Sequence, residues 1–150
     1  KALHLHAVRG VGGEIYVAGE QGLFAKLDRS TGLFRTLAVP YQGTLFGIVG
    51  NDRTVIVHGL RGTALRSTDG GLSWQTVETK LAVGLTGSTL ADGAIVIVSQ
   101  AGHLLVSRDD GASFTAAQVE RPLPAAAVIA AGKGAIVVAG PRGVAPLPLQ

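Results

Sequence analysis

Apolar residues occur along the chain in short runs, and turn-forming residues separate the runs. In the middle of the chain, Leu45–Val49, Thr54–His58 and Thr63–Ser67 are separated by Asn51-Asp52-Arg53 and by Gly59–Gly62. Runs of this length, rich in Val, Ile, Leu and Thr and bounded by Gly, Asn and Asp, predict β-strands joined by tight turns. No run approaches the 18 or so apolar residues of a membrane span.

The pattern returns after about forty residues, which is the length of a four-stranded propeller blade. The positions that repeat are a glycine before the third run (Gly22, Gly62, Gly102) and an aromatic residue at the start of the fourth (Phe34, Trp74, Phe114). The repeat therefore predicts an all-β fold, a β-propeller segment of about four antiparallel blades in a single domain, with blades over 3–39, 45–78, 85–119 and 125–150. The outer strands are predicted over Phe34–Val39, Trp74–Glu78 and Phe114–Val119.

The last blade is predicted to be incomplete. It offers Ala125–Ala130, Ala135–Ala139 and Gly143–Gln150, and no fourth run follows. Pro146 and Pro148 make the third of these a poor central strand. We interpret the chain as part of a larger propeller. The alternatives are two copies that pair through exposed blade edges to complete a ring, and a four-bladed ring closed within this chain.

A conserved spacing of Ser, Asp, Gly, Ser and an aromatic residue occurs twice, and we call these two segments the acidic hairpins. Their residues are Ser67, Asp69, Gly71, Ser73 and Trp74 in the first and Ser107, Asp109, Gly111, Ser113 and Phe114 in the second. The Asp carboxylates are predicted to accept hydrogen bonds from loop N–H groups, the Gly residues to permit a positive φ, and the rings to be buried under the loop. These roles are structural, so we predict no catalytic residue among them.

The acidic hairpins resemble the Asp-box, also called the bacterial neuraminidase (BNR) repeat, which lies between the third and fourth strands of propeller blades. The longer string from Gly59 to Val77, GLRGTALRSTDGGLSWQTV, is similar to the photosystem II stability/assembly-factor-like propellers, which also occur in bacteria without photosynthesis. This resemblance implies a non-enzymatic, protein-binding scaffold, and export to the periplasm or the cell surface.

Composition narrows the function further. The net charge is only +3, and the basic residues are spread along the chain rather than clustered with aromatic residues, so nucleic acid is not the expected partner. There are no cysteines, which excludes disulfides, thiolate catalysis and Cys-based zinc sites. We expect no cofactor.

Asp-boxes are common in sialidase-like glycosidases, which depend on a recognisable catalytic set. Such a set needs an arginine cluster, a Tyr nucleophile with a Glu partner and an acid. Tyr16 and Tyr41 are the only tyrosines, and Tyr16 lies between Ile15 and Val17, where packing is expected. None of the four glutamates, Glu14, Glu20, Glu78 and Glu120, forms a recognisable pair with a tyrosine. The alternative to the scaffold is therefore a glycosidase-like or carbohydrate-binding propeller whose catalytic residues lie outside this chain.

Histidines provide no clear metal site. His4 and His6 are two apart on a predicted strand and so share a face, but His58 and His103 belong to other blades. With no further ligand in view, we predict none of them to bind a metal.

Arginines give the candidate binding surface. Arg61 and Arg142 both precede a turn glycine between the second and third runs of their repeats, and Arg121 lies in a connection between blades. In a propeller these segments share the face opposite the acidic hairpins. Guanidinium groups suit carboxylates and carbonyls, so the three residues are either solvated or part of a partner-binding patch. Arg66 and Arg108, near the acidic hairpins, are expected to be structural.

Overall fold

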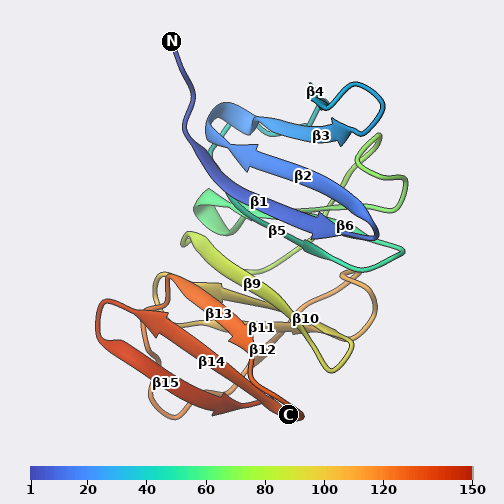
Figure 1. Ribbon diagram of the computed structural model, residues 1–150. Coiled ribbons are helices and arrows are strands. Elements are labelled where there is room, and N and C mark those ends of the chain that lie inside the picture. The colour runs from blue at the N-terminus through green and yellow to red at the C-terminus, as the bar shows by residue number, and fades with distance from the viewer. Residues whose placement is uncertain (150) are drawn as a thin grey trace.

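The computed structural model describes residues 1–149 and consists of antiparallel sheets that follow one another along the chain (Figure 1). In each sheet the strands pair in sequence order, as expected for runs joined by tight turns. We call each sheet a blade. Each one falls within a range predicted from the forty-residue repeat, and the all-β prediction is confirmed.

The first two blades have four strands each. Blade 1 contains β1 (Leu5–Val11), β2 (Glu14–Gly19), β3 (Phe24–Asp28) and β4 (Leu33–Thr36), with a 3-10 turn η1 (Glu20–Gly22) after β2. Blade 2 contains β5 (Leu45–Gly50), β6 (Val55–Gly59), β7 (Ala64–Ser67) and β8 (Gln75–Thr76), with a 3-10 turn η2 (Leu60–Gly62) after β6. The predicted Gly59–Gly62 turn is thus largely this 3-10 turn.

Blade 3 has four strands and blade 4 has three within the described residues. Blade 3 contains β9 (Leu85–Ala91), β10 (Ala94–Ser99), β11 (Leu104–Ser107) and β12 (Thr115–Ala117). Blade 4 contains β13 (Ala127–Ala130), β14 (Ala135–Gly140) and β15 (Gly143–Pro148). The three runs predicted for blade 4 are therefore its three strands. Gln150, the end of the predicted third run, lies outside the described residues.

The outer strands are shorter than predicted. β8 spans only Gln75–Thr76 and β12 only Thr115–Ala117, whereas the sequence pattern extends to Glu78 and Val119. An outer strand pairs with one neighbour only and is solvated on its other edge, so less of it is held in the ladder. The residues beyond these strands lead to the next inner strand.

The outer edge of β15 is poor in hydrogen-bond donors. The Leu149 N–H donates to the Gly134 carbonyl, on the inner side of the strand. Because N–H groups alternate along a strand, positions 144, 146 and 148 face outward. Pro146 and Pro148 occupy two of these positions and have no N–H. This edge is therefore protected against strand addition.

The inner strands β1, β5, β9 and β13 pack side by side around a common axis, and small residues allow the close approach. A Cβ on Gly87 would lie 3.0 Å from Cα of Ala127 in the next blade. A Cβ on Gly47 would lie 2.3 Å from the ring of His58, which is fully buried. Gly87 therefore permits close packing of blades 3 and 4, and Gly47 leaves room for the His58 ring within blade 2.

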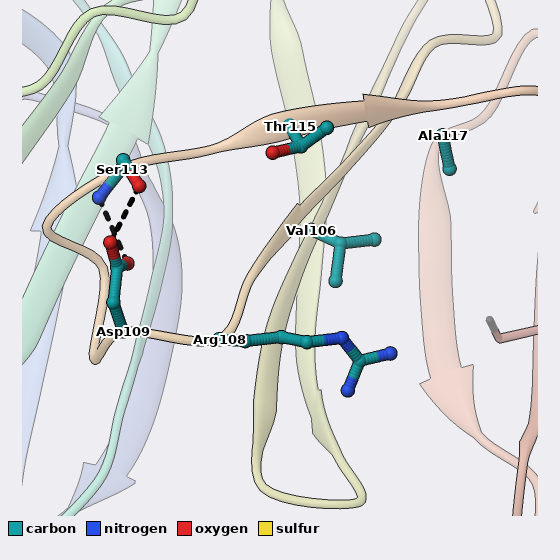
Figure 2. Close-up of a pocket in the computed structure, with 6 residues that line it drawn as sticks. All are labelled: Val106, Arg108, Asp109, Ser113, Thr115 and Ala117. Atoms are coloured by element: carbon teal, nitrogen blue, oxygen red, sulfur yellow. Dashed lines mark hydrogen bonds between the residues drawn. The ribbon is translucent and has the colours of Figure 1, made fainter.

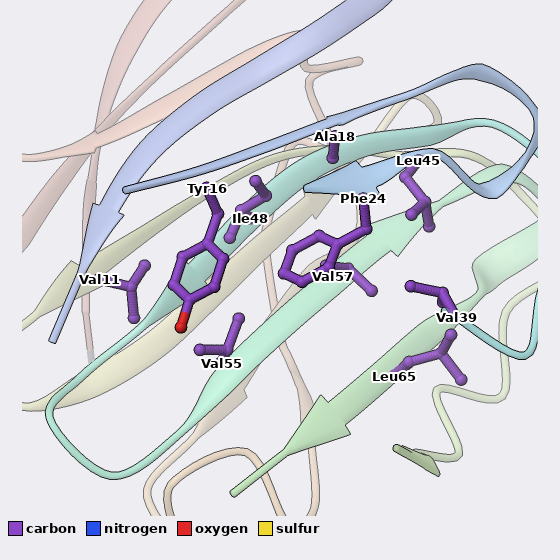
Figure 3. Packing of buried hydrophobic residues seen from close by; sticks show 10 residues of the cluster. All are labelled: Val11, Tyr16, Ala18, Phe24, Val39, Leu45, Ile48, Val55, Val57 and Leu65. Atoms are coloured by element: carbon purple, nitrogen blue, oxygen red, sulfur yellow. The ribbon is translucent and has the colours of Figure 1, made fainter. Parts of the chain in front are cut away.

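Each pair of neighbouring blades encloses its own hydrophobic core. Between blades 1 and 2, Tyr16 and Phe24 stack with ring centroids 5.2 Å apart and pack on residues of blade 2 such as Ile48 and Val57 (Figure 3). Val49 and Ile56 pack against Ile95 and Ile97 between blades 2 and 3. Val96 and Val98 pack against Ile136 and Val138 between blades 3 and 4. Every inner blade is thus apolar on both faces.

The outermost faces of blades 1 and 4 stay open, so the sheets do not close into a ring. Leu5 of blade 1 is 59% exposed, although Leu45 and Leu85 at the same repeat position are 0% exposed. Val144 of blade 4 is 72% exposed. Ala64 of blade 2 and Leu104 of blade 3 have the same place in their blades, judged by their partners on the second strand, and they are at most 4% exposed. The alternative of a four-bladed ring closed within this chain is therefore wrong.

Candidate functional site

Both acidic hairpins have the hydrogen bonds expected of them. In the first, Asp69 accepts from the backbone N–H of Ser73 at 2.9 Å and from the hydroxyls of Ser67 and Ser73. The Ser67 hydroxyl oxygen in turn accepts from the Gly71 N–H at 2.8 Å. The second hairpin repeats this network with Asp109, Ser107, Ser113 and Gly111. Figure 2 shows the part between Asp109 and Ser113.

Both carboxylates accept several hydrogen bonds in this network. Hydrogen bonds from Ser73 and Ser67 lower the pKa of Asp69 to about 2, and those from Ser113 and Ser107 lower the pKa of Asp109 to about 2. A general acid near neutral pH needs a pKa raised toward neutrality. Neither residue is therefore suited to donate a proton, which supports their structural interpretation.

The remaining motif residues pack against the preceding blade. Gly71 has φ +92°, and a Cβ there would lie 2.8 Å from the Phe24 ring of blade 1. Trp74 contacts the same ring edge-on, with centroids 5.1 Å apart. Gly111 has φ +78° and faces Ile56 of blade 2, while Phe114 packs on the same core. The acidic hairpins therefore fix how consecutive blades fit together.

Blade 1 has a different hairpin between its third and fourth strands. Asp28 accepts from the N–H and hydroxyl of Ser30 and from Nε of Arg35 at 2.8 Å. The Ser30 hydroxyl and the Arg35 guanidinium lower the pKa of Asp28 to about 2. The Asp28 carboxylate again holds its own loop together. Its salt bridge to Arg35 replaces the bond that the second serine of an acidic hairpin provides.

Asp110 links blades 2 and 3, a role that sequence analysis missed. Its carboxylate accepts from Asn51 Nδ2 at 2.7 Å and from two nitrogens of Arg53 at 2.9 and 3.0 Å. Its carbonyl accepts from Arg66 Nε at 2.8 Å, which confirms a structural role for Arg66. The aligned first hairpin has Gly70 in place of Asp110, so the repeat gave no signal for this contact.

Two open hollows lie beside the hairpins, and both follow the repeat. One, of about 410 Å³, is lined by Arg108 and Asp109 together with Val106, Thr115 and Ala117 of β11 and β12 (Figure 2). The other, of about 450 Å³, is lined by residues at the corresponding positions eighty residues earlier: Lys26, Asp28, Arg29, Arg35 and Leu37. The recurrence with different side chains indicates a feature of blade geometry rather than a conserved ligand site.

Among residues 1–149, the tyrosine and histidine side chains form neither an activated nucleophile nor a metal-binding group. Tyr16 is buried, and burial together with the nearby Glu14 charge raises its pKa, which is the opposite of an activated nucleophile. His4 Nδ1 lies 2.9 Å from Glu20, and His6 packs edge-on against Phe46. No group of three or more metal-ligating side chains occurs among residues 1–149.

Loops after β2, β6, β10 and β14 gather on the face opposite the hairpins, on the left in Figure 1, and we call this the loop face. Arg61, exposed and with φ +56°, lies on it within η2. The loop is held on two sides: the Leu60 N–H donates to the Thr44 carbonyl at 3.1 Å, and the Thr79 hydroxyl donates to the Gly62 carbonyl at 2.7 Å. Arg61 therefore projects from a rigid base.

Arg142 lies on the loop face in a different turn. Gly140 pairs with Gly143, so β14 and β15 join through two residues and no 3-10 turn forms. Arg142, like Arg61, directly precedes a glycine with positive φ, but its loop is one residue shorter than the loop that contains Arg61. Arg121 lies in the connection from β12 to β13, which ends at the same face, and both side chains are exposed.

The arginines of the two faces differ in their bonding. On the hairpin side, Arg29, Arg35, Arg53 and Arg66 all donate to protein oxygens. Within residues 1–149, Arg61, Arg121 and Arg142 make no hydrogen bond or ion pair. Among the acidic residues of the loop face, Glu20 is bonded to His4 and Glu78 accepts from the Lys80 N–H, whereas Glu120 lies exposed beside Arg121. Free donors for an external ligand are thus concentrated on this face.

This architecture defines a segment of a β-propeller: four antiparallel blades around an axis, with the ring left open. No family model matches the chain. No curated protein matches it either. Nothing among residues 1–149 forms a helix that could cross a membrane.

Many solved structures have a similar fold, and three of them illustrate the similarity. The computationally designed Ika4 protein has 14% identity and a TM-score of 0.76, with 98% of this chain and 92% of that one covered. Streptogramin B lyase has 17% identity and a TM-score of 0.74, with 97% and 55% covered. YCF48 bound to D1 peptide has 13% identity and a TM-score of 0.62, with 97% and 53% covered. The chain therefore spans about half the length of the last two, and identities this low show the fold alone.

Proposed function

We propose that this propeller segment is a non-enzymatic scaffold that binds an acidic or extended protein segment across its loop face. The observation behind the proposal is the set of three exposed arginines, Arg61, Arg121 and Arg142, that have no partner within the described residues. Guanidinium groups recognise carboxylates and backbone carbonyls through paired N–H donors. The loop that contains Arg61 is rigid, so less conformational entropy is lost when this residue binds a partner.

Two further observations support a binding role over catalysis. The carboxylates of the acidic hairpins are committed to their own loops, and Tyr16 is buried. The hairpins resemble the Asp-boxes of exported assembly-factor-like propellers, and one structure of similar fold holds a peptide, D1, on YCF48. By this analogy the protein acts in the periplasm or at the cell surface.

A peptide-binding measurement tests the proposal. Fluorescence polarisation of a labelled, short glutamate-rich peptide at low salt is compared between the wild-type protein and the variant R61A/R121A/R142A. Exposed ion pairs are worth about 0.2–1 kcal/mol each, so the variant should bind about tenfold more weakly.

The matched control is R29A/R35A/R53A, which removes the same charge from the hairpin side. It should retain wild-type affinity once circular dichroism has verified its fold. Equal weakening by both variants would show that the peptide responds to net charge alone, and that result would refute a specific loop-face site.

A further inference from the structure

The outer faces of blades 1 and 4 are apolar and uncovered among the described residues. Each inner blade packs one face, which we call the leading face, on the previous blade and the other, the trailing face, on the next blade. Blade 1 has an open leading face with Leu5, Val8 and Phe34 exposed, and blade 4 has an open trailing face with Ile129 and Val144 exposed. The chain thus ends in two different, unpaired apolar surfaces.

Residues on the open leading face of blade 1 match those buried in the chain's own blade interfaces. Leu5 takes the position of Leu45 and Leu85, and Val8 takes that of Ile48, all of which are buried in cores between blades. Phe34 takes the position of Trp74 and Phe114, which pack on those same cores. The leading face of blade 1 therefore has the side chains needed to cover the trailing face of a preceding blade.

The trailing face of blade 4 is apolar across all three strands. Residues that lie opposite one another on β13, β14 and β15 form two rows on this face. One row is Ala127, Ala139 and Val144, and the next is Ile129, Val137 and Pro146. Ile129 corresponds to Val49, and Val144 to Leu104, both buried against the following blade. A contiguous apolar face of this kind marks a protein contact.

We propose that a second copy of this chain covers both faces at once. In this arrangement the leading face of blade 1 of each copy packs on the trailing face of blade 4 of the other. The two contacts are equivalent by a two-fold axis, so the assembly closes without leaving an apolar face. It has eight blades, within the usual range for propellers, and the chain spans about half of two solved structures of similar fold.

Contact through faces differs from pairing through strand edges. The prolines of β15 remove two outward N–H donors, so the free edge of blade 4 is a poor site for adding a strand. Face-to-face packing needs no such donors. It also repeats an interface that the chain already forms three times between its own blades.

Mass measurement tests the proposal on the chain of 15.2 kDa. Size-exclusion chromatography with light scattering should give twice this mass for the wild-type protein. Val144→Asp and Val8→Lys place a charge on one half of the interface, so each variant alone should have the monomer mass. Both residues are exposed in the single chain, so the monomer should keep its fold, and circular dichroism checks this. Leu72→Asp, at an exposed hairpin position away from both faces, should leave the dimer intact.

An equimolar mixture of the two charged variants is the decisive arm. One of its two interfaces has only wild-type residues, and the other has an Asp and a Lys, so the dimer mass should return. A monomeric wild-type protein at every concentration would refute the proposal and favour further blades from a longer polypeptide. Open polymers, a Val144→Asp variant that still dimerises, or a mixture that stays monomeric would equally overturn the closed two-copy ring.

Discussion

His58 occupies a fully buried position at the base of blade 2, and its hydrogen bonds define its protonation state. Nδ1 lies 2.9 Å from the Leu85 carbonyl, which only accepts, so Nδ1 bears the proton. Nε2 then accepts from the Ser88 hydroxyl at 2.7 Å. Burial, with a smaller contribution from the Arg9 charge, lowers the His58 pKa to about 4. The ring thus joins blades 2 and 3 as a neutral group.

Stability should therefore fall as the pH drops from about 6.5 to about 4. In this window the unfolded chain binds a proton at His58 while the folded protein stays neutral, so protonation favours unfolding. The pKa difference corresponds to about 2–4 kcal/mol. Urea unfolding at a series of pH values measures it.

His58→Gln removes the titrating ring and should flatten this part of the profile, although the variant is less stable overall. His6→Gln, at an exposed position, is the control and should keep the wild-type slope. The carboxylates Asp28, Asp69 and Asp109 add a separate loss of stability only below about pH 4, because their pKa values are about 2 in the folded state. An unchanged slope in His58→Gln would contradict the assignment.

Each acidic hairpin acts as an element that fastens its blade to the one before it. The Ser–Asp–Ser network fixes the loop, and the loop then places its glycine on a core residue of the neighbouring blade. In the second hairpin this residue is Ile56, which is fully buried. Local hydrogen bonding is thereby converted into a contact between blades.

Gly111→Ala should consequently cost more than an alanine at a comparable turn. The new Cβ would lie 2.1 Å from Cδ1 of Ile56, and overpacking costs about 1–3 kcal/mol in addition to about 1–2 kcal/mol for a left-handed backbone. Gly93→Ala, at φ +77° with nothing within 4 Å of the new Cβ, should lose only the stability that the left-handed backbone costs. Chemical denaturation of both variants at neutral pH gives the difference, and equal losses would show that the hairpin glycine does not brace blade 2.

Sequence reasoning found the strands and the hairpin bonds because both depend on residues close together in the chain. The Ser67, Asp69 and Ser73 contacts span only a few residues, and turn chemistry alone indicates them. The Asp110 contacts with Asn51 and Arg53 join residues more than fifty positions apart, and the repeat does not conserve them. The same limit affects Arg142, whose loop is set by the pairing of Gly140 with Gly143 rather than by the motif around it.

Across the whole molecule, the apolar faces between neighbouring blades are buried, and those at the two ends of the arc are exposed. Three cores lie between blades, while large apolar residues at the two ends stay exposed. The candidate arginines lie in loops of the loop face, whereas the exposed apolar residues of the two ends lie mainly in strands. Partner binding and the proposed pairing of two copies therefore use different surfaces and can be tested separately.

Pairing of two copies predicts a melting temperature that depends on protein concentration. Association favours the folded state by mass action, so a tenfold higher concentration should raise the melting temperature by about 1–3 °C. Val144→Asp should melt at a concentration-independent temperature. Differential scanning fluorimetry across a dilution series decides the matter, and a flat wild-type series would speak against the pairing.

The prolines on the outward side of β15 have a consequence for the chain's behaviour before any partner arrives. A sheet edge with a full row of donors can template incoming strands and grow into cross-β fibrils. Because positions 146 and 148 offer no N–H, the last blade is a poor seed for such growth even while its broad face is bare. The outward edge of β15 is therefore a weak template for amyloid-like growth.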